Sequence, residues 1–333
     1  MDKNKIVYLF PGQGAQYSGM AMDLLSSDAV KSLFDTASEI FGKDVKDILN
    51  GDADSLKRTD ISQPAITVAN LAAAVYLKEK GYQPAACAGF SLGEYAALVC
   101  AGIIDTADCF RLVKVRGEAM QKTADCLREI ALQNSQQNNN NDPAPGMAAV
   151  VGLTPEQVES LITKWSSEGL KDLYAANINS PKQVVVSGTA AALTEAEVRF
   201  KEAGAKRVIR LQVIGPFHSP LMIDALETFV PVLESITFRN PQITIFSNVT
   251  GKIISSGAEA KKLAVQQITC PVRWVDEQVS IAAFCKETKI EANLEVGPGK
   301  VLQGLWKDFS VTGISGSDTP IFAAGTIEDI EKL

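Results

Sequence analysis

The feature that most constrains this fold is a serine, Ser91, with a glycine two residues away on each side, Gly89 and Gly93. A short apolar run, residues 84–87, precedes this stretch, and a helical-looking segment, residues 94–101, follows it. A serine between a strand and a helix with this spacing is typical of a nucleophile elbow, a turn in which neighbouring backbone comes too close for a Cβ. The turn holds the hydroxyl clear of the sheet, beside a helix N-terminus whose free N–H groups can stabilise an oxyanion. Ser91 is therefore the candidate nucleophile, although the bare pattern also occurs in plain tight turns.

Composition argues against several classes of function. The 333 residues are 46% hydrophobic, which is enough for one large domain or one with an inserted smaller unit. With 32 basic and 39 acidic residues the net charge is −7, which argues against general nucleic-acid binding. Neither a signal peptide nor a membrane-spanning stretch is recognisable, so we expect a cytoplasmic enzyme with no membrane partner. The six cysteines form no C-x-x-C pair, which favours buried free thiols over a metal site or disulfides.

The order of apolar segments predicts an α/β fold. Residues 5–10 indicate a buried first strand, and the loop after it, residues 11–16, is well placed to line an active site. The glycine spacing in that loop fails the dinucleotide-binding fingerprint, so no nucleotide cofactor is expected there. Strand and helix patterns over residues 1–126 and 214–333 together predict one large domain, a parallel sheet covered by helices.

Between these two segments the pattern changes twice. Residues 127–145 are rich in glutamine and asparagine and predict a flexible linker, because a polar low-complexity run cannot bury a core. Residues 146–213 then follow the order strand, helix, strand, strand, helix, strand, which is the ferredoxin-like pattern. We therefore expect a small ferredoxin-like domain inserted into the larger one.

The chain has a single histidine, His218. It lies where the chain re-enters the larger domain, just before Ser219 and Pro220, which suit the cap and the first position of a helix. This place would direct it into the cleft between the two domains. A lone histidine is more often a helix-terminus or packing residue than a base. Because an elbow serine is inert without a base, however, His218 is the candidate partner of Ser91.

One arginine, Arg116, occupies an unusual position. On a helical projection of residues 105–123 it falls among apolar side chains such as Val115 and Leu112. A guanidinium directed at a core is costly unless it meets an anion. Two explanations remain open: a salt bridge to an internal acid, or the binding of a negatively charged ligand.

Seven dispersed segments together resemble one family, the malonyl-CoA:acyl carrier protein transacylases. They run in the family's order over almost the whole chain, which is far more specific than any single motif. The segments are Phe10–Gly14, Gly89–Tyr95, Val115–Gly117, Asn179–Pro181 with Gln183–Val185, Phe217–Pro220, Pro271–Trp274 and Glu295–Gly299.

The resemblance implies an α/β-hydrolase-like parallel-sheet domain that carries the inserted ferredoxin-like one. It implies that Ser91 is acylated by the thioester of malonyl-CoA and that His218 acts as general base and then as general acid. The free carboxylate of the malonyl group would pair with Arg116. The acyl group would then pass to the phosphopantetheine thiol of acyl carrier protein with ping-pong kinetics, for fatty acid synthesis.

The resemblance also implies the supporting groups of the site. Backbone N–H groups of Gln13 and Leu92 would form the oxyanion hole, and the backbone carbonyl of Gln267 would orient the histidine in place of an aspartate. The partners would be malonyl-CoA and acyl carrier protein, with no cofactor beyond the coenzyme A thioester substrate and no metal. The enzyme would be a monomer.

Two phenylalanines bear on acyl selectivity. Phe90 stands where most family members have a histidine before the serine, so we expect the shape or polarity beside the acyl group to differ. Phe217 precedes His218 and is bulky, as in the related polyketide acyltransferases that accept malonyl. The sequence therefore favours malonyl over methylmalonyl.

Three other functions remain open from the sequence. The chain could be a discrete trans-acting acyltransferase of polyketide synthesis, or a serine thioesterase or acyl hydrolase that uses the same Ser91 and His218. A pocket for plain acyl chains would gain nothing from a buried Arg116, which argues against the hydrolase. The third possibility is a non-catalytic module that binds carrier protein and is never acylated on Ser91.

Overall fold

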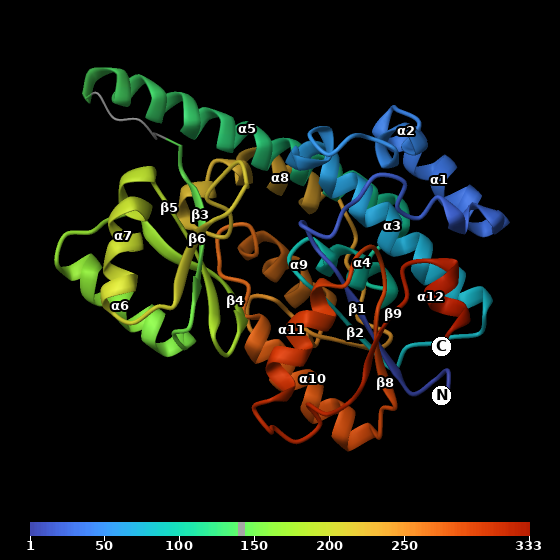
Figure 1. Ribbon diagram of the computed structural model, residues 1–333. Helices are drawn as coiled ribbons and strands as arrows, with labels where there is room; N and C mark the ends of the chain where they lie inside the picture. Colours follow the sequence, from blue (N-terminus) through green and yellow to red (C-terminus); the bar gives the residue numbers. More distant parts are fainter. Residues whose placement is uncertain (139–143) are drawn as a thin grey trace.

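The computed structural model describes residues 1–138 and 144–333. Within these ranges, the larger part of the molecule is built around a parallel sheet of five strands in the order β7-β2-β1-β8-β9 (Figure 1). In this sheet Phe10 pairs with Gly89 and Leu9 with Glu295, so three neighbouring strands end at the same edge. The loops after these strands therefore meet at that edge, where open α/β sheets bind ligands. The strands are β1 Ile6–Phe10, β2 Ala86–Gly89, β7 Thr244–Ile245, β8 Ala292–Glu295 and β9 Ile321–Ala323.

Helices cover both faces of this sheet (Figure 1). They are α1 Asp28–Phe41, α2 Val45–Leu49, α3 Thr59–Glu79, α4 Gly93–Cys100, α5 Thr106–Asn138, α8 Ala225–Glu234, α9 Gly257–Gln266, α10 Trp274–Thr288, α11 Val301–Ser310 and α12 Ile327–Glu331, with short 3-10 helices η1 Asp23–Ser26, η2 Ser55–Lys57 and η3 Pro220–Met222. Successive side chains of a strand point to opposite faces. Tyr8 and Phe10 therefore pack with α1, α3 and α4, whereas Val7 and Leu9 pack with α10 and α11.

A second sheet, antiparallel and with four described strands in the order β4-β5-β3-β6, forms the smaller part. Its elements are β3 Gly146–Val151, α6 Pro155–Ser167, β4 Leu173–Ser180, β5 Gln183–Gly188, α7 Ala190–Glu202 and β6 Arg207–Arg210. The predicted ferredoxin-like order of strands and helices is therefore present. Trp165 of α6 and Phe200 of α7 meet edge to face, with ring centroids 4.7 Å apart, in the core between this sheet and its two helices.

The long helix α5 corrects one prediction. The sequence predicted a flexible linker over residues 127–145, but α5 continues through residues 127–138 and extends above the small sheet in the view of Figure 1. The polar composition of residues 127–138 argues against their burial, but it does not argue against a helix. A helix already nucleated by the packed residues 106–126 extends at little cost through leucine, arginine, glutamate, alanine and glutamine. Residues 139–143 of the predicted linker lie outside the described residues.

The two sheets share a hydrophobic core and one backbone pairing. Met147 and Val185 of the small sheet belong to the same buried cluster as the helices of the large part. Two backbone hydrogen bonds of 2.8 Å join Val272 to β4. The N–H of Val272 donates to the carbonyl of Ala176, and the N–H of Ile178 donates to the carbonyl of Val272. The segment just before α10 is thus held against the small sheet.

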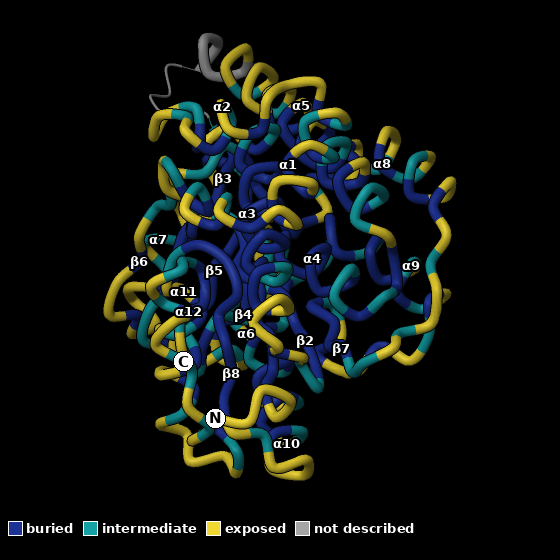
Figure 2. The backbone as a smooth tube through the Cα atoms, turned by 90° about the vertical axis from the view of Figure 1, so that its right-hand side faces the viewer, coloured by how far each residue is buried: buried dark blue, intermediate teal, exposed yellow. Residues whose placement is uncertain are grey.

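Burial follows this architecture. Figure 2 shows the strands β2, β5 and β8 in the buried interior, with the exposed positions on outward turns of helices and on loops. In the part of the chain that the structure describes, no helix combines the length and the apolar character needed to cross a bilayer.

The start of α4 leads to a test of the fold. A Cβ added at Gly93 would lie 2.0 Å from the carbonyl oxygen of Phe10, so Gly93→Ala is expected to lower the free energy of unfolding by about 3 kcal/mol, the cost of overpacking. Urea denaturation measures this. Gly304→Ala is the matched control, because nothing lies within 4 Å of its added Cβ, and it should be neutral or stabilising by up to about 1 kcal/mol. Equal stability of the two variants would contradict the close packing of the elbow.

Candidate active site

Ser91 lies in a tight turn between β2 and α4, as the sequence predicted. Its φ is +49°, in the left-handed region that an L-residue enters at a cost of about 1 kcal/mol. The glycines on either side permit the turn, since a Cβ on Gly89 would lie 2.1 Å from the backbone of Gly93. The turn is therefore a strained elbow that requires both glycines.

The structure brings Ser91 and His218 together although 127 residues separate them in the chain. The distance from Ser91 Oγ to His218 Nε2 is 2.7 Å, and His218 Nδ1 lies 2.9 Å from the backbone oxygen of Gln267. A carbonyl oxygen can only accept, so Nδ1 carries the hydrogen and Nε2 is left to accept from the hydroxyl. This arrangement suits proton abstraction from the serine.

His218 is 4% exposed, and its surroundings favour the neutral ring. Burial and the nearby charge of Arg116 lower the pKa of His218 from 6.5 to about 4, while the Gln267 carbonyl acts in the opposite direction. The imidazole is therefore uncharged at neutral pH and free to take up a proton.

Arg116 is 1% exposed and points from α5 toward the same site. Its Nη2 donates to the side-chain oxygen of Gln267 at 3.3 Å, and its guanidinium lies over the ring of Tyr95 at 5.3 Å. Its Nε has no partner, and among the described residues no carboxylate lies within ion-pair distance. Of the two explanations that the sequence left open, the internal salt bridge is therefore absent from the described chain.

A pocket of about 280 Å³ lies between the two sheets and contains Ser91, His218 and Arg116 in its lining. Asn179 and Val185 of the small sheet line its opposite wall. The pocket is thus formed by both parts of the molecule, with the hydroxyl, the imidazole and the guanidinium directed into one space.

Four further residues named from the sequence also line this pocket: Gln13, Leu92, Phe90 and Phe217. In the described chain, neither the N–H of Gln13 nor that of Leu92 has a protein acceptor. Phe90 packs edge-on against Trp274, with ring centroids 5.4 Å apart. Gln267, by contrast, lies behind the pocket at 1% exposure and contacts it through His218 and Arg116.

Sequence reasoning missed Asn248, which lies at the base of the elbow. Its Oδ1 accepts from the N–H of Ser91 at 2.6 Å, and its backbone N–H donates to the Glu94 carboxylate at 2.7 Å. Its position just after β7, at the carboxyl end of a parallel strand, is the signal that could have indicated it.

Glu94 and Glu277 are buried acids beside Asn248 that the sequence analysis also left unassigned. Burial raises the pKa of Glu94 from 4.5 to about 7, although hydrogen bonds from Asn248 and Gln267 and the charge of Arg116 oppose this. Burial also raises the pKa of Glu277, and the neighbouring Glu94 adds to that effect. Among the described residues, no group of three metal-binding side chains occurs.

Comparison with known proteins agrees with this geometry. Residues 7–169 match the acyl transferase domain family. The chain is 36% identical over 310 residues to a malonyl CoA-acyl carrier protein transacylase of Bacillus subtilis, covering 91% of this chain and 90% of that protein. Its structure is similar to an acyl carrier protein S-malonyltransferase of Vibrio cholerae, with a TM-score of 0.84, 33% identity and 99% of each chain covered. It is also similar to a malonyl-transacylase solved in complex with its type II PKS acyl-carrier protein, with a TM-score of 0.83, 33% identity and 98% of each chain covered. The expected fold class is confirmed.

The buried acid Glu94 makes the stability of this site depend on pH. Between pH 4.5 and about 7 the folded protein retains a proton that the unfolded chain has lost, so the free energy of unfolding falls as the pH rises through this window. In Glu94→Gln this contribution is absent. Relative to wild type, the variant should therefore gain about 3 kcal/mol between pH 4 and pH 8, as measured by urea denaturation. A constant difference between the two proteins would show that Glu94 does not titrate in this range.

Proposed function

Because this chain belongs to the malonyl CoA-acyl carrier protein transacylase family, we propose that Ser91 is the residue that carries the malonyl group in transit. The chain is an acyltransferase that moves malonyl from malonyl-CoA to the thiol of acyl carrier protein. The transferred group supplies fatty acid synthesis, and a discrete acyltransferase of polyketide synthesis is the alternative.

In the first half-reaction, Ser91 Oγ attacks the thioester carbonyl while His218 Nε2 takes the hydroxyl proton. The tetrahedral oxyanion accepts from the N–H groups of Gln13 and Leu92, a type of contact worth about 3 kcal/mol for each donor. The carbon–sulfur bond then breaks, and coenzyme A leaves with the proton from His218. The product is a malonyl ester on Ser91.

In the second half-reaction, the phosphopantetheine thiol of the carrier protein gives its proton to His218 and attacks the ester. The carbon–oxygen bond breaks, and Ser91 recovers the proton from His218. The acyl donor malonyl-CoA and the acyl acceptor, the carrier-protein thiol, enter the same pocket in turn, and coenzyme A leaves between the two steps, so the kinetics are ping-pong. The backbone carbonyl of Gln267 keeps the imidazole in the tautomer that both steps use.

The observation that carries this proposal is Arg116. It is a buried guanidinium in the wall of the pocket that holds Ser91, and among the described residues no carboxylate lies within ion-pair distance of it, although the charge of Glu94 acts on it from farther away. Such a group costs free energy until an anion reaches it. The free carboxylate of a malonyl group on Ser91 supplies that anion, whereas the alkyl chain of a plain acyl thioester does not. A thioesterase for such substrates is therefore the weaker alternative.

Acyl selectivity is assigned to Phe90 and Phe217. Both line the pocket, and Phe217 is 6% exposed beside His218. The bulk of Phe217 next to His218 disfavours an α-methyl branch, and Phe90 alters the shape and polarity beside the acyl group, so we propose malonyl rather than methylmalonyl as substrate.

Further assignments complete the proposal. The chain acts as a monomer, in the cytoplasm, with the coenzyme A thioester as its substrate and no separate cofactor. Its six cysteines are all free thiols, which fits a reducing compartment. Residues 1–126 and 214–333 form the large catalytic domain and residues 146–213 the small one.

Arg116→Ala tests the substrate assignment. Loss of the guanidinium should lower kcat/KM for malonyl-CoA by about 100-fold to 1,000-fold, equivalent to a broken buried ion pair, and change the reaction with acetyl-CoA far less. Arg116→Lys keeps the charge without the planar guanidinium, so its kcat/KM for malonyl-CoA should lie between those of wild type and Arg116→Ala. Malonyl transfer at the wild-type rate by Arg116→Ala would overturn the assignment.

Intact-protein mass spectrometry tests the covalent step. Wild type mixed with malonyl-CoA should gain the mass of one malonyl group, and Ser91→Ala should gain none. His218→Gln should be acylated about 100-fold to 10,000-fold more slowly, because the general base is lost. No adduct on the wild type would support the non-catalytic carrier-binding alternative, and an adduct on Ser91→Ala would place the nucleophile elsewhere.

A further inference from the structure

The side-chain amide of Asn248 spans the strained turn that carries Ser91. Its Oδ1 accepts from the N–H of Ser91 at 2.6 Å, and its Nδ2 donates to the carbonyl of Gly89 at 2.6 Å. The two contacts clamp the backbone on both sides of Phe90, from a residue that is 0% exposed. Among the described residues, Asn248 is the single acceptor for the Ser91 N–H.

We propose that Asn248 is a positioning residue of the acyl transfer, which holds the elbow in the conformation that directs Ser91 Oγ at His218 Nε2. The inference rests on the proposed function and adds to it a group that touches neither substrate nor the reacting atoms. A left-handed serine costs free energy, and such strain persists only where surrounding contacts over-determine it. The amide of Asn248 supplies two of those contacts directly to the turn.

The chemistry of the turn requires an amide at this place. The Ser91 N–H needs an acceptor and the Gly89 carbonyl needs a donor, and an amide group provides both. An apolar side chain would leave both backbone groups unpaired in a buried site. A carboxylate would place negative charge against the Gly89 carbonyl and beside the acids Glu94 and Glu277.

Asn248 is itself held from three directions. Its backbone N–H donates to Glu94 of α4 at 2.7 Å, its carbonyl accepts from the N–H of Arg273 at 2.8 Å, and its Nδ2 donates to Glu277 of α10 at 2.8 Å. A side chain that is itself held by hydrogen bonds can fix the position of the group it contacts, here the turn that carries Ser91. The elbow is thereby tied to α10 and to the segment that leads into it.

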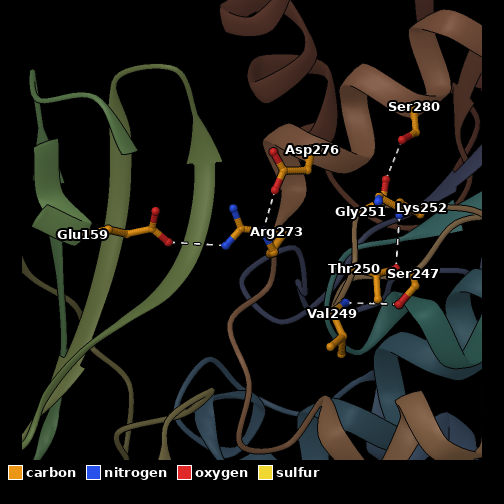
Figure 3. A network of polar contacts seen from close by, with 9 residues as sticks. All are labelled: Glu159, Ser247, Val249, Thr250, Gly251, Lys252, Arg273, Asp276 and Ser280. Atoms are coloured by element: carbon orange, nitrogen blue, oxygen red, sulfur yellow. Dashed lines mark hydrogen bonds and ion pairs between the residues drawn. The ribbon is translucent and has the colours of Figure 1, made fainter. Parts of the chain in front are cut away.

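The turn that contains Asn248 is fastened to α10 as well (Figure 3). The N–H of Ser247 donates to the carbonyl of Lys252 at 2.9 Å, which closes the turn, and Ser280 Oγ donates to the carbonyl of Gly251 at 2.5 Å. Figure 3 also shows Arg273 between Asp276 and Glu159. Its guanidinium pairs with Asp276 at 2.5 Å and with Glu159 at 3.3 Å, so the residue whose N–H holds the Asn248 carbonyl also contacts α6 of the small domain.

Asn248 also contacts Gln267, the residue whose backbone carbonyl orients His218. The side-chain N–H of Gln267 donates to Ser91 O at 3.0 Å and to Asn248 Oδ1 at 3.4 Å, while the backbone carbonyl of Gln267 accepts from His218. Asn248 is therefore linked through the side chain of Gln267 to the residue whose carbonyl fixes the imidazole, so the nucleophile and the base are held by connected groups.

Single-turnover acylation of the full chain by malonyl-CoA, followed by rapid quenching and intact mass, tests the proposal. Asn248→Ala should acylate Ser91 about 100-fold more slowly, the effect of displacing a reacting atom by about 1 Å, with KM within about threefold of wild type. Asn293→Ala is the matched control, because Asn293 is equally buried, in β8, and contacts Cys285 rather than the elbow. It should acylate at the wild-type rate even if it is less stable.

Asn248→Asp keeps the shape of the side chain and tests the role even if the alanine variant fails to fold. When protonated, aspartic acid can accept from Ser91 N–H and donate to the Gly89 carbonyl, but the carboxylate cannot donate. The groups that face position 248 are Glu94 and Glu277, with Arg116 and His218 beyond Gln267. The rate of Asn248→Asp relative to wild type at the same pH should therefore rise as the pH falls, which a merely structural role would not produce.

The outcomes separate the two proposals. If wild type is not malonylated on Ser91, the proposed function fails. If wild type is malonylated but Asn248→Ala is acylated at the wild-type rate, the positioning role is overturned. It is also overturned if the acylation rate of Asn248→Ala is reduced no more than that of Asn293→Ala at equal stability. A pH-independent rate ratio for Asn248→Asp would overturn it as well.

Discussion

The site depends on how closely α4 approaches the edge of the parallel sheet. Gly93 lies so near the carbonyl of Phe10 that no Cβ fits between them, and Gly89 lies equally near Gly93. This approach starts the helix immediately after the strand, so Ser91 and the N–H of Leu92 stand at the sheet edge beside the loop that carries Gln13. The geometry of the pocket therefore depends on two close backbone contacts, Gly93 with Phe10 and Gly89 with Gly93, which any residue larger than glycine would prevent.

Gln267 relates the three polar groups of the site to one another. Its backbone carbonyl accepts from His218, its side-chain oxygen accepts from Arg116, and its side-chain N–H donates to the backbone of Ser91. All of these contacts come from a neutral residue. An acid in its place would neutralise Arg116 internally, so the uncharged amide leaves the guanidinium available for a ligand carboxylate.

The fold was largely predictable from local patterns, and the failures have physical causes. The ferredoxin-like order of residues 146–213 followed from alternating apolar segments and clear turn residues. The helical course of residues 127–138 did not, because a polar run looks the same whether it is loop or an exposed continuation of a packed helix.

By itself the sequence determined the chemical candidates: an elbow serine, a single histidine and one arginine on an apolar helical face. Each of these is a local property, set by turn geometry, by composition or by helical periodicity. Only the tertiary structure decided that they share one pocket, that no internal acid of the described chain pairs with Arg116, and that Asn248 and Gln267 hold the nucleophile and the base. Those facts depend on contacts between residues that lie 49 to 176 positions apart, and no local pattern encodes such contacts.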